Sequence, residues 1–391
     1  MLLVVTTMLV AFGTIAVATA SEGQAVANGG SSFSIILRDL VYLGFGLFAL
    51  YVMARLRLSR VIRSAPLLIL VGLAMLAAVK LVGVTSDGGK RWLNLHAILL
   101  QPSEMFKLFT VLFLAWLVQN HHEELSNWKQ LLVWTSPVAI GAALVLVEPD
   151  IGTTSVIVAV AFSMLAVAGL AKKRLAQIGI LGVATFLGYM KMKPYSAARF
   201  FAFLHPNRDL AGSGYQLLQS KIGLGAGGLT GLGLGNSREK FGLLPNPHTD
   251  FVFTIIGEEL GLIGSLVVIG LFIGFLLVAT RIAKQCTNEV YRLLVVGVTT
   301  WIVLEAIINI ASVVGGWAVT GIPLPFFSYG GTALITELAA VGLLYNIAHD
   351  TSHSGEVEIR EPHVASLREA HVARPVRSHA RRAPSGSRRV R

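Results

Sequence analysis

Long apolar runs separated by short polar segments make up most of the chain. Runs of about 20 apolar residues have the length that an α-helix needs to cross the hydrocarbon core of a bilayer. Short segments of alternating hydrophobicity, which are typical of a transmembrane barrel, are absent from the sequence. The pattern therefore predicts an all-α, polytopic membrane protein. We expect ten spans, at residues 2–20, 34–54, 66–84, 103–119, 130–147, 152–170, 175–190, 251–279, 292–314 and 331–348.

Composition agrees with this pattern. The chain has 391 residues, of which 54% are hydrophobic and 14% are charged, whereas a soluble domain carries roughly a quarter charged residues. Residues 1–20 end in small side chains, as a signal peptide does, but they have no basic segment before the apolar run. We therefore expect them to remain as the first span.

Basic residues in the short loops predict the orientation. They follow spans two, six and eight, as Arg55, Arg57, Arg60 and Arg63, then Lys172, Lys173 and Arg174, then Arg281, Lys284 and Arg292. With ten spans these loops lie on one side, which the positive-inside rule makes cytoplasmic. Both termini are then cytoplasmic, and the large loop between spans seven and eight is extracytoplasmic.

Much of the net charge of +11 lies in the last residues, where seven Arg and no acidic residue occur between Arg374 and Arg391. We expect residues 1–350 to form the membrane domain and residues 351–391 a disordered, basic cytoplasmic tail. Such a tail favours anionic lipid over nucleic acid, because the basic patches lack interleaved aromatic residues. Cys286 is the only cysteine, so no intramolecular disulfide can form.

The large loop contains the glycine-rich stretch "GLGAGGLTGLGLGNSREKFG", with seven Gly between Gly223 and Gly235. Glycine permits tight turns and close approach of the backbone to a ligand. A flexible linker would have a similar composition, and the sequence leaves both interpretations open. The stretch is not a P-loop, because no Gly-Lys-Ser/Thr follows it.

Two polar groups flank spans four to six. Glu104 and Lys107 stand three residues apart after Pro102 and share one helix face. They predict either an internal ion pair or a polar cavity for a charged head group. Asp150, in "EPDIGTTS", either caps the following helix or belongs to the same polar site.

Further polar residues fall within or beside the last spans. Glu305, Asn309 and Glu337 lie in predicted spans, where ionisable and polar side chains normally face the bundle interior or a water-filled cavity. The intervening "GGWAVTGIPLPFFSYGGT" is apolar but rich in Gly and Pro. Such backbone suits a re-entrant segment, which is tolerated only where protein or water satisfies its polar groups.

The stretch "LLPNPHTDFVFTIIGEELG" places Asp250 at the extracytoplasmic mouth of span eight, with Glu258 and Glu259 about two turns deeper. A carboxylate at this position can accept a proton from a sugar hydroxyl, as general bases do. It can equally be a helix N-cap. The residues alone thus predict a polar site that faces outward, without naming its reaction.

The segments "RWLNL", "QPSEMFKL", "EPDIGTT", "GLGLGNSREKFGLLPNPHTDFVFTIIGEELG" and "GIPLPFFSYGGT" carry a family resemblance. In this order and spacing, over about residues 1–350, the chain resembles the SEDS proteins (shape, elongation, division and sporulation), and its motifs are more similar to FtsW than to RodA. The resemblance implies a peptidoglycan glycosyltransferase that polymerises lipid II into glycan strands with inversion and loss of undecaprenyl pyrophosphate.

The same resemblance implies roles for single residues. Asp250, in "HTDF", matches the family's essential aspartate and is the expected catalytic base. Glu104 and Lys107 match polar residues that line the central cavity. Arg91 and Asp150 match further polar positions near that cavity, so we expect all four to contact substrate.

Lys221, Arg238 and Lys240 are candidates for contact with the pyrophosphate, on their charge and location alone. Lysine offers phosphate oxygens a point charge and arginine a planar fork. We expect no metal-ligating residues and no defined cofactor; a requirement for a divalent cation such as Mg²⁺ is left open.

The resemblance also implies partners and location. We expect a multi-pass protein of the bacterial plasma membrane at the division septum, acting with a class B penicillin-binding protein (a transpeptidase) and other divisome proteins. Two alternatives stay open, a flippase that moves lipid II across the membrane and a scaffold that recruits partners through residues 351–391. Joining of sugars by purified protein separates the polymerase from both.

Overall fold

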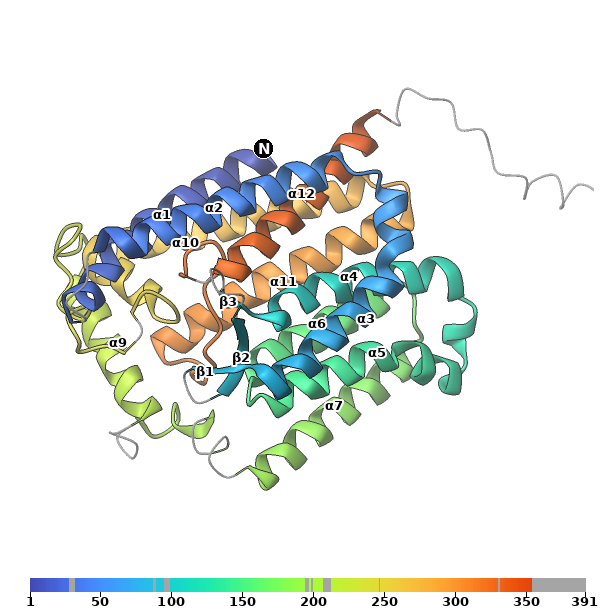
Figure 1. The fold of residues 1–391 in the computed structure, drawn as a ribbon, viewed down its shortest axis with the longest axis horizontal. Coiled ribbons are helices and arrows are strands. Elements are labelled where there is room, and N and C mark those ends of the chain that lie inside the picture. The colour runs from blue at the N-terminus through green and yellow to red at the C-terminus, as the bar shows by residue number, and fades with distance from the viewer. Residues whose placement is uncertain are drawn as a thin grey trace, which may run out of the picture. The chain divides into compact units, whose positions relative to one another are not determined.

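The computed structural model describes residues 1–27, 32–86, 89–94, 99–193, 197, 200–206, 212–245, 247–329 and 331–353. Within these residues, ten long helices lie where the hydrophobic pattern predicts spans (Figure 1). They are α1 Leu2–Ala27, α2 Ser32–Arg55, α3 Leu58–Val82, α4 Pro102–His121, α5 Trp128–Val147, α6 Ile151–Val167, α7 Lys172–Met192, α10 Val252–Gln285, α11 Glu289–Val314 and α12 Gly331–His353.

Eight of these helices are long and apolar enough to cross a membrane. Of the other two, α6 is apolar but has only 17 residues, and α4 carries Glu104 and Lys107 in its first two turns. The prediction of an all-α, polytopic membrane protein is confirmed. The assignment of α4 and α6 as full spans stays a prediction.

The loops contain structure that the hydrophobic pattern does not predict. These elements are strands β1 Val84–Ser86, β2 Gly89–Asn94 and β3 Leu99–Leu100, the 3₁₀ turn η1 Glu124–Ser126, and helix α9 Ser213–Gly227. The strands form a small antiparallel sheet in the order β1-β2-β3. Three glycines in the second half of α9 conceal its helical character in the sequence, because glycine has a low helix propensity.

Two predicted helix boundaries also change. Helix α3 begins at Leu58, eight residues before the predicted start, and contains Pro66. Proline is common at the first position of a helix, where its missing N–H is harmless, but here it lies inside the helix. Arg60 and Arg63 therefore belong to α3 and not to a loop. Helix α10 is interrupted at Gly261, which has φ 67° and ψ −163°, so the predicted span eight is two helical segments.

Helices α4, α11 and α12 form the buried centre. Helix α11 packs against α4, α6, α9 and α10, and α4 also packs against α3. Helix α7, by contrast, buries only Met190, and α2 presents large apolar side chains such as Phe48 and Tyr51. Exposed apolar faces of this kind suit contact with lipid chains.

The N-terminal helix is joined closely to this bundle. Helix α1 runs beside α2 and α10 (Figure 1). A Cβ atom on Gly13 would lie 1.9 Å from the Phe326 carbonyl oxygen, and one on Gly23 would lie 1.8 Å from that of Lys240. Glycine at these positions lets the backbones touch, as small residues do between membrane helices.

The glycine-rich stretch packs tightly against the break in α10. Leu232 N donates to the Glu258 carbonyl oxygen (3.0 Å), and Gly233 N donates to that of Glu259 (2.9 Å). A Cβ atom on Gly231 would lie 2.1 Å from the Glu259 carbonyl oxygen. The glycines thus allow backbone-to-backbone packing, and the flexible-linker interpretation is wrong for residues 223–235.

Residues 1–351 form one compact unit. Most of the predicted tail lies outside the described residues. Its disorder and its boundary at residue 351 stay predictions.

The orientation predicts which loops are reachable from outside intact cells. In a Cys286→Ser background, Asn236→Cys places an exposed thiol in the large loop, and Ser59→Cys places one at the start of α3. We expect a membrane-impermeant maleimide to label Asn236→Cys in intact cells and Ser59→Cys only after permeabilisation. The reverse labelling pattern would mean that the membrane orientation is inverted.

Two glycines with nearly the same φ separate steric contact from backbone strain. Gly231 (φ 81°) lies against Glu259, whereas Gly235 (φ 80°) has open space around its Cβ position. Gly235→Ala should destabilise the protein by ~1–2 kcal/mol, the cost of placing a residue with a Cβ atom in the left-handed conformation. Gly231→Ala should cost about 1–3 kcal/mol more, from overpacking. Melting temperatures of detergent-solubilised protein measure the difference, and equal temperatures would contradict close packing at Gly231.

Candidate active site

Asp250 lies in a short segment before α10 whose backbone is held from several sides. The Asn309 side-chain amide, on α11, donates to the Asp250 carbonyl oxygen (2.8 Å) and to that of Ile322 (2.8 Å). Asn309 is buried, so both of its N–H groups are used in a site that excludes water. Asp250 itself is half-buried.

The two carbonyl groups before Asp250 are held in the same way. Ser328 Oγ donates to the Thr249 carbonyl oxygen (2.7 Å), and Tyr329 N donates to that of His248 (2.9 Å). Three consecutive carbonyl groups thus accept hydrogen bonds from α11 or from the segment between α11 and α12. This arrangement fixes the direction in which the Asp250 backbone leaves the loop.

The N-cap of α10 is Phe251, which makes no side-chain capping bond. Asp250 therefore lies one residue before the cap position. The capping interpretation of Asp250 does not match this geometry, whereas the interpretation as a residue of a polar site is compatible with it.

Below Asp250, a buried cluster of charges joins α4 to α11. Lys107 Nζ lies 2.7 Å from Glu104 Oε2 and pairs also with Glu305. Glu305 accepts a further bond from Trp301 Nε1 (2.7 Å), and all three charged side chains are almost fully buried. The internal ion pair predicted for Glu104 and Lys107 is confirmed, with Glu305 as a partner that the sequence did not assign.

Glu337 fixes the segment between α11 and α12 from the other side. Its Oε2 accepts a bond from Phe326 N (2.8 Å), and its side chain is buried. Leu324 and Phe327 of the same segment are also buried. The irregular, apolar backbone predicted for this segment is confirmed, and several of its backbone polar groups bond to protein partners.

Glu305 and Asn309 connect the ion cluster to the Asp250 segment. They are four residues apart on α11 and lie on one face, with Cβ atoms about 5–6 Å apart. The Lys107 cluster thus lies one helical turn from the amide that holds Asp250.

Arg91 and Asp150 make hydrogen bonds at the turn between α5 and α6. Arg91, on β2, donates through Nε to the Glu148 carbonyl oxygen (3.0 Å) and through Nη2 to that of Pro149 (2.9 Å). The Asp150 carboxylate accepts from Thr153 N (2.9 Å) and Thr153 Oγ1 (3.0 Å). The prediction that Asp150 caps the following helix is confirmed.

Glu148, in the same turn, is a buried carboxyl group. Its pKa is raised to about 7, chiefly by burial and also by the nearby Asp150 carboxylate, against the opposing effects of Lys80 and Arg91. Its Oε1 has no hydrogen-bond partner among the described residues. A substantial protonated fraction near neutral pH follows for this group.

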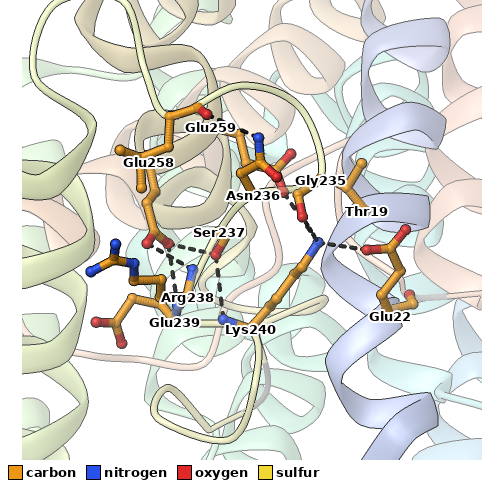
Figure 2. Close-up of polar contacts among 12 residues, drawn as sticks. Thr19, Glu22, Gly235, Asn236, Ser237, Arg238, Glu239, Lys240, Glu258 and Glu259 are labelled. Atoms are coloured by element: carbon orange, nitrogen blue, oxygen red, sulfur yellow. Dashed lines mark hydrogen bonds and ion pairs between the residues drawn. The ribbon is translucent and has the colours of Figure 1, made fainter.

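Glu258 explains why a carboxylate follows the apolar start of α10. Its carboxylate accepts bonds from Ser237 Oγ (2.5 Å), Arg238 N (2.9 Å) and Glu239 N (3.3 Å), as Figure 2 shows. Glu258 is buried, so its charge is balanced by the three donors of the loop. It therefore anchors the large loop to α10.

Lys240 lies at the centre of the neighbouring contacts in Figure 2. Its ammonium group bonds to Glu22 Oε2 (2.6 Å) and the Gly235 carbonyl oxygen (2.8 Å), and lies 3.5 Å from Glu259 Oε1. The Lys240 side chain is fully buried. Lys240 links the loop to α1 and α10. Because its ammonium group is buried and already bonded to these protein partners, it does not fit the predicted contact with pyrophosphate.

Glu239, in the large loop, is another buried carboxyl group of this region. Burial raises its pKa to about 7, and the charge of Glu258 contributes to the rise. The folded state therefore disfavours the ionised form of Glu239. The free energy of unfolding should decrease as the pH rises from the ordinary pKa of a glutamate to about 7.

Lys221 and Arg238 remain exposed. The Lys221 stem packs over Gly315, where a Cβ atom would lie 2.2 Å from Lys221 Cε, at the end of α11. The backbone N–H of Arg238 donates to the Glu258 carboxylate, and this bond leaves the guanidinium group unused. These two cations are available to a ligand, unlike Lys240.

The described residues contain no group of three or more His, Cys, Asp or Glu side chains that could hold a metal ion. The sequence predicted that Asn309 faces the bundle interior but not which groups it contacts, and it did not single out Ser328, since an amide or hydroxyl in an apolar run gives no sign of the backbone it will contact.

Known proteins match almost the whole chain. The model of the FtsW/RodA/SpoVE family, described as cell cycle protein, matches residues 1–353. Stage V sporulation protein E of Bacillus subtilis is 34% identical over 351 residues, covering 89% of this chain and 96% of that protein. The probable peptidoglycan glycosyltransferase FtsW of Coxiella burnetii is 36% identical over 361 residues, covering 90% and 96%.

Solved structures match in the same way. A chain of the structure described as "Structural coordination of polymerization and crosslinking by a peptidoglycan synthase complex" gives a TM-score of 0.75 at 27% identity, covering 90% of this chain and 97% of that one. The rod shape determining protein RodA of Thermus thermophilus gives 0.65 at 26% identity, covering 89% and 96%. The chain therefore belongs to the FtsW/RodA/SpoVE family, as its motifs predicted.

Proposed function

We propose that this membrane protein is a peptidoglycan glycosyltransferase that polymerises lipid II, with Asp250 as the catalytic base. The observation that carries the proposal is the set of three hydrogen bonds to the consecutive carbonyl groups of residues 248–250. Holding a reacting group in one geometry lowers the barrier of a bimolecular reaction. The curated names of FtsW relatives support the same activity.

The reaction needs one base. The acceptor 4-hydroxyl attacks the anomeric carbon of an α-linked donor, and the new β-1,4 bond forms as the bond to the pyrophosphate oxygen breaks. Asp250 accepts the hydroxyl proton, and undecaprenyl pyrophosphate leaves with the electron pair. A single displacement inverts the anomeric centre, so no covalent sugar intermediate on the protein is required.

The leaving pyrophosphate needs positive charge, which stabilises the transition state most where it is fixed in advance. Lys221 and Arg238 are exposed on the large loop and fit this role. Glu104 and Lys107 form a fixed, buried floor beneath Asp250, and Arg91 and Asp150 shape the turn after α5. We propose that Glu104, Lys107, Arg91 and Asp150 keep the helices around the substrate in register. Their effect on the substrate is then indirect, through the positions of these helices.

The surroundings fit two lipid-linked substrates. Both polyprenyl chains need access from the bilayer, and the exposed apolar faces of α2 and α7 suit contact with lipid chains. We propose that the protein works at the division septum, with both termini cytoplasmic, beside a class B penicillin-binding protein and other divisome proteins. The peptidoglycan synthase complex with a similar chain combines polymerization and crosslinking, which supports such a partnership.

Asp250→Asn tests the role of the carboxylate. Asparagine keeps the size and the backbone hydrogen bonds of residue 250 but cannot accept a proton at neutral pH. Polymerisation of labelled lipid II by reconstituted protein should fall ~10²–10⁴-fold, as expected for a lost general base.

Glu289→Gln is the control, because its carboxylate is exposed near Arg292 on the far end of α11; its activity should equal that of the wild type. A well-folded Asp250→Asn protein that polymerises normally would remove the catalytic assignment. Transport of lipid II by wild-type protein without any sugar joining would favour the flippase alternative.

A further inference from the structure

A small pocket lies at the opposite end of the bundle from Asp250. It has a volume of about 190 Å³ and lies between the turn after α4 and the turn that joins α6 to α7. It is far larger than the ~10–15 Å³ that one ordered water needs. Its lining residues are His122, Leu125, Ser126, Leu165, Ala168, Gly169, Leu170, Ala171 and Arg174.

Two polar side chains fasten the walls of this pocket. Arg174 Nη1 donates to the Leu125 carbonyl oxygen (3.0 Å), and His122 Nε2 donates to that of Ala168 (2.9 Å). Each bond crosses from one turn to the other. The Arg174 guanidinium is therefore oriented before any ligand arrives, and its other N–H groups make no hydrogen bond within the described part of the chain.

The lining includes an apolar part, and exposed lysines flank it. Leu125 and Leu165 of the lining are buried, while Lys172 and Lys173, which precede Arg174 in the sequence, are exposed outside the lining. The pocket occurs where α4 and α6 end and α7 begins, so it lies at the level where hydrocarbon meets water. It is also on the face that the positive-inside rule makes cytoplasmic.

We propose that this pocket binds the phosphate of an anionic phospholipid. Arg174 supplies a planar fork for the phosphate oxygens, and Lys172 and Lys173 add positive potential near the surface. The glycerol part of the lipid covers Leu125 and Leu165. The lipid thereby holds the two turns together from the membrane side, at a site separate from the one proposed for lipid II.

Native mass spectrometry of the full-length protein, titrated with phosphatidylglycerol or phosphatidylcholine, tests the proposal. We expect phosphatidylglycerol to bind preferentially. Arg174→Gln should weaken that binding about tenfold or more, as the loss of a charge-assisted hydrogen bond predicts. Ala171→Phe, which fills the pocket and keeps every charge, should weaken it as well.

Lys129→Gln is the matched control, since Lys129 is an exposed cation near the same end of the bundle but outside the pocket lining. It should bind phosphatidylglycerol as the wild type does. Equal binding by wild-type, Arg174→Gln and Ala171→Phe proteins would overturn the proposal. Full displacement of the lipid by millimolar inorganic phosphate would also overturn it, because the site would then recognise free phosphate.

Discussion

The amide group of Asn309 is the interaction on which the candidate site depends. Its two N–H groups donate to the carbonyl oxygens of Asp250 and Ile322, which belong to segments on either side of α11 in the sequence. Because the amide is buried, loss of either acceptor would leave an N–H group without a partner, at a cost of about 1–3 kcal/mol. One residue of α11 therefore sets the position of both segments at once.

Buried charges give this arrangement its stiffness. Lys107 can remain charged within the bundle only beside Glu104 and Glu305, and removing one partner of a buried pair typically costs about 3–5 kcal/mol. The contact therefore fixes the register of α4 against α11, one turn below Asn309. Glu258 does the same for the large loop, because its carboxylate needs the donors of Ser237, Arg238 and Glu239.

Much of the helical framework follows from the sequence, as do local contacts such as the Asp150 cap and the Glu104–Lys107 pair, which periodicity places on one face. Contacts between distant segments do not follow. Lys107 and Glu305 are 198 residues apart, and Lys240 and Glu22 are 218 apart, so helix periodicity carries no information on their pairing. The glycines of residues 223–235 were ambiguous for the same reason, since their role depends on the break in α10 against which they pack.

The most direct measurement compares Asn309→Ala with Ser312→Ala in steady-state polymerisation of lipid II. Ser312, on the same helix, bonds to the Ala318 carbonyl oxygen (2.7 Å), so each variant loses buried contact with the segment after α11, but only Asn309 holds Asp250. We expect Asn309→Ala to lower kcat about 10²-fold, as a misplaced reacting group does, with little change in KM. Ser312→Ala should stay near the wild-type rate. Equal loss of kcat in both variants, or none in Asn309→Ala, would contradict the account.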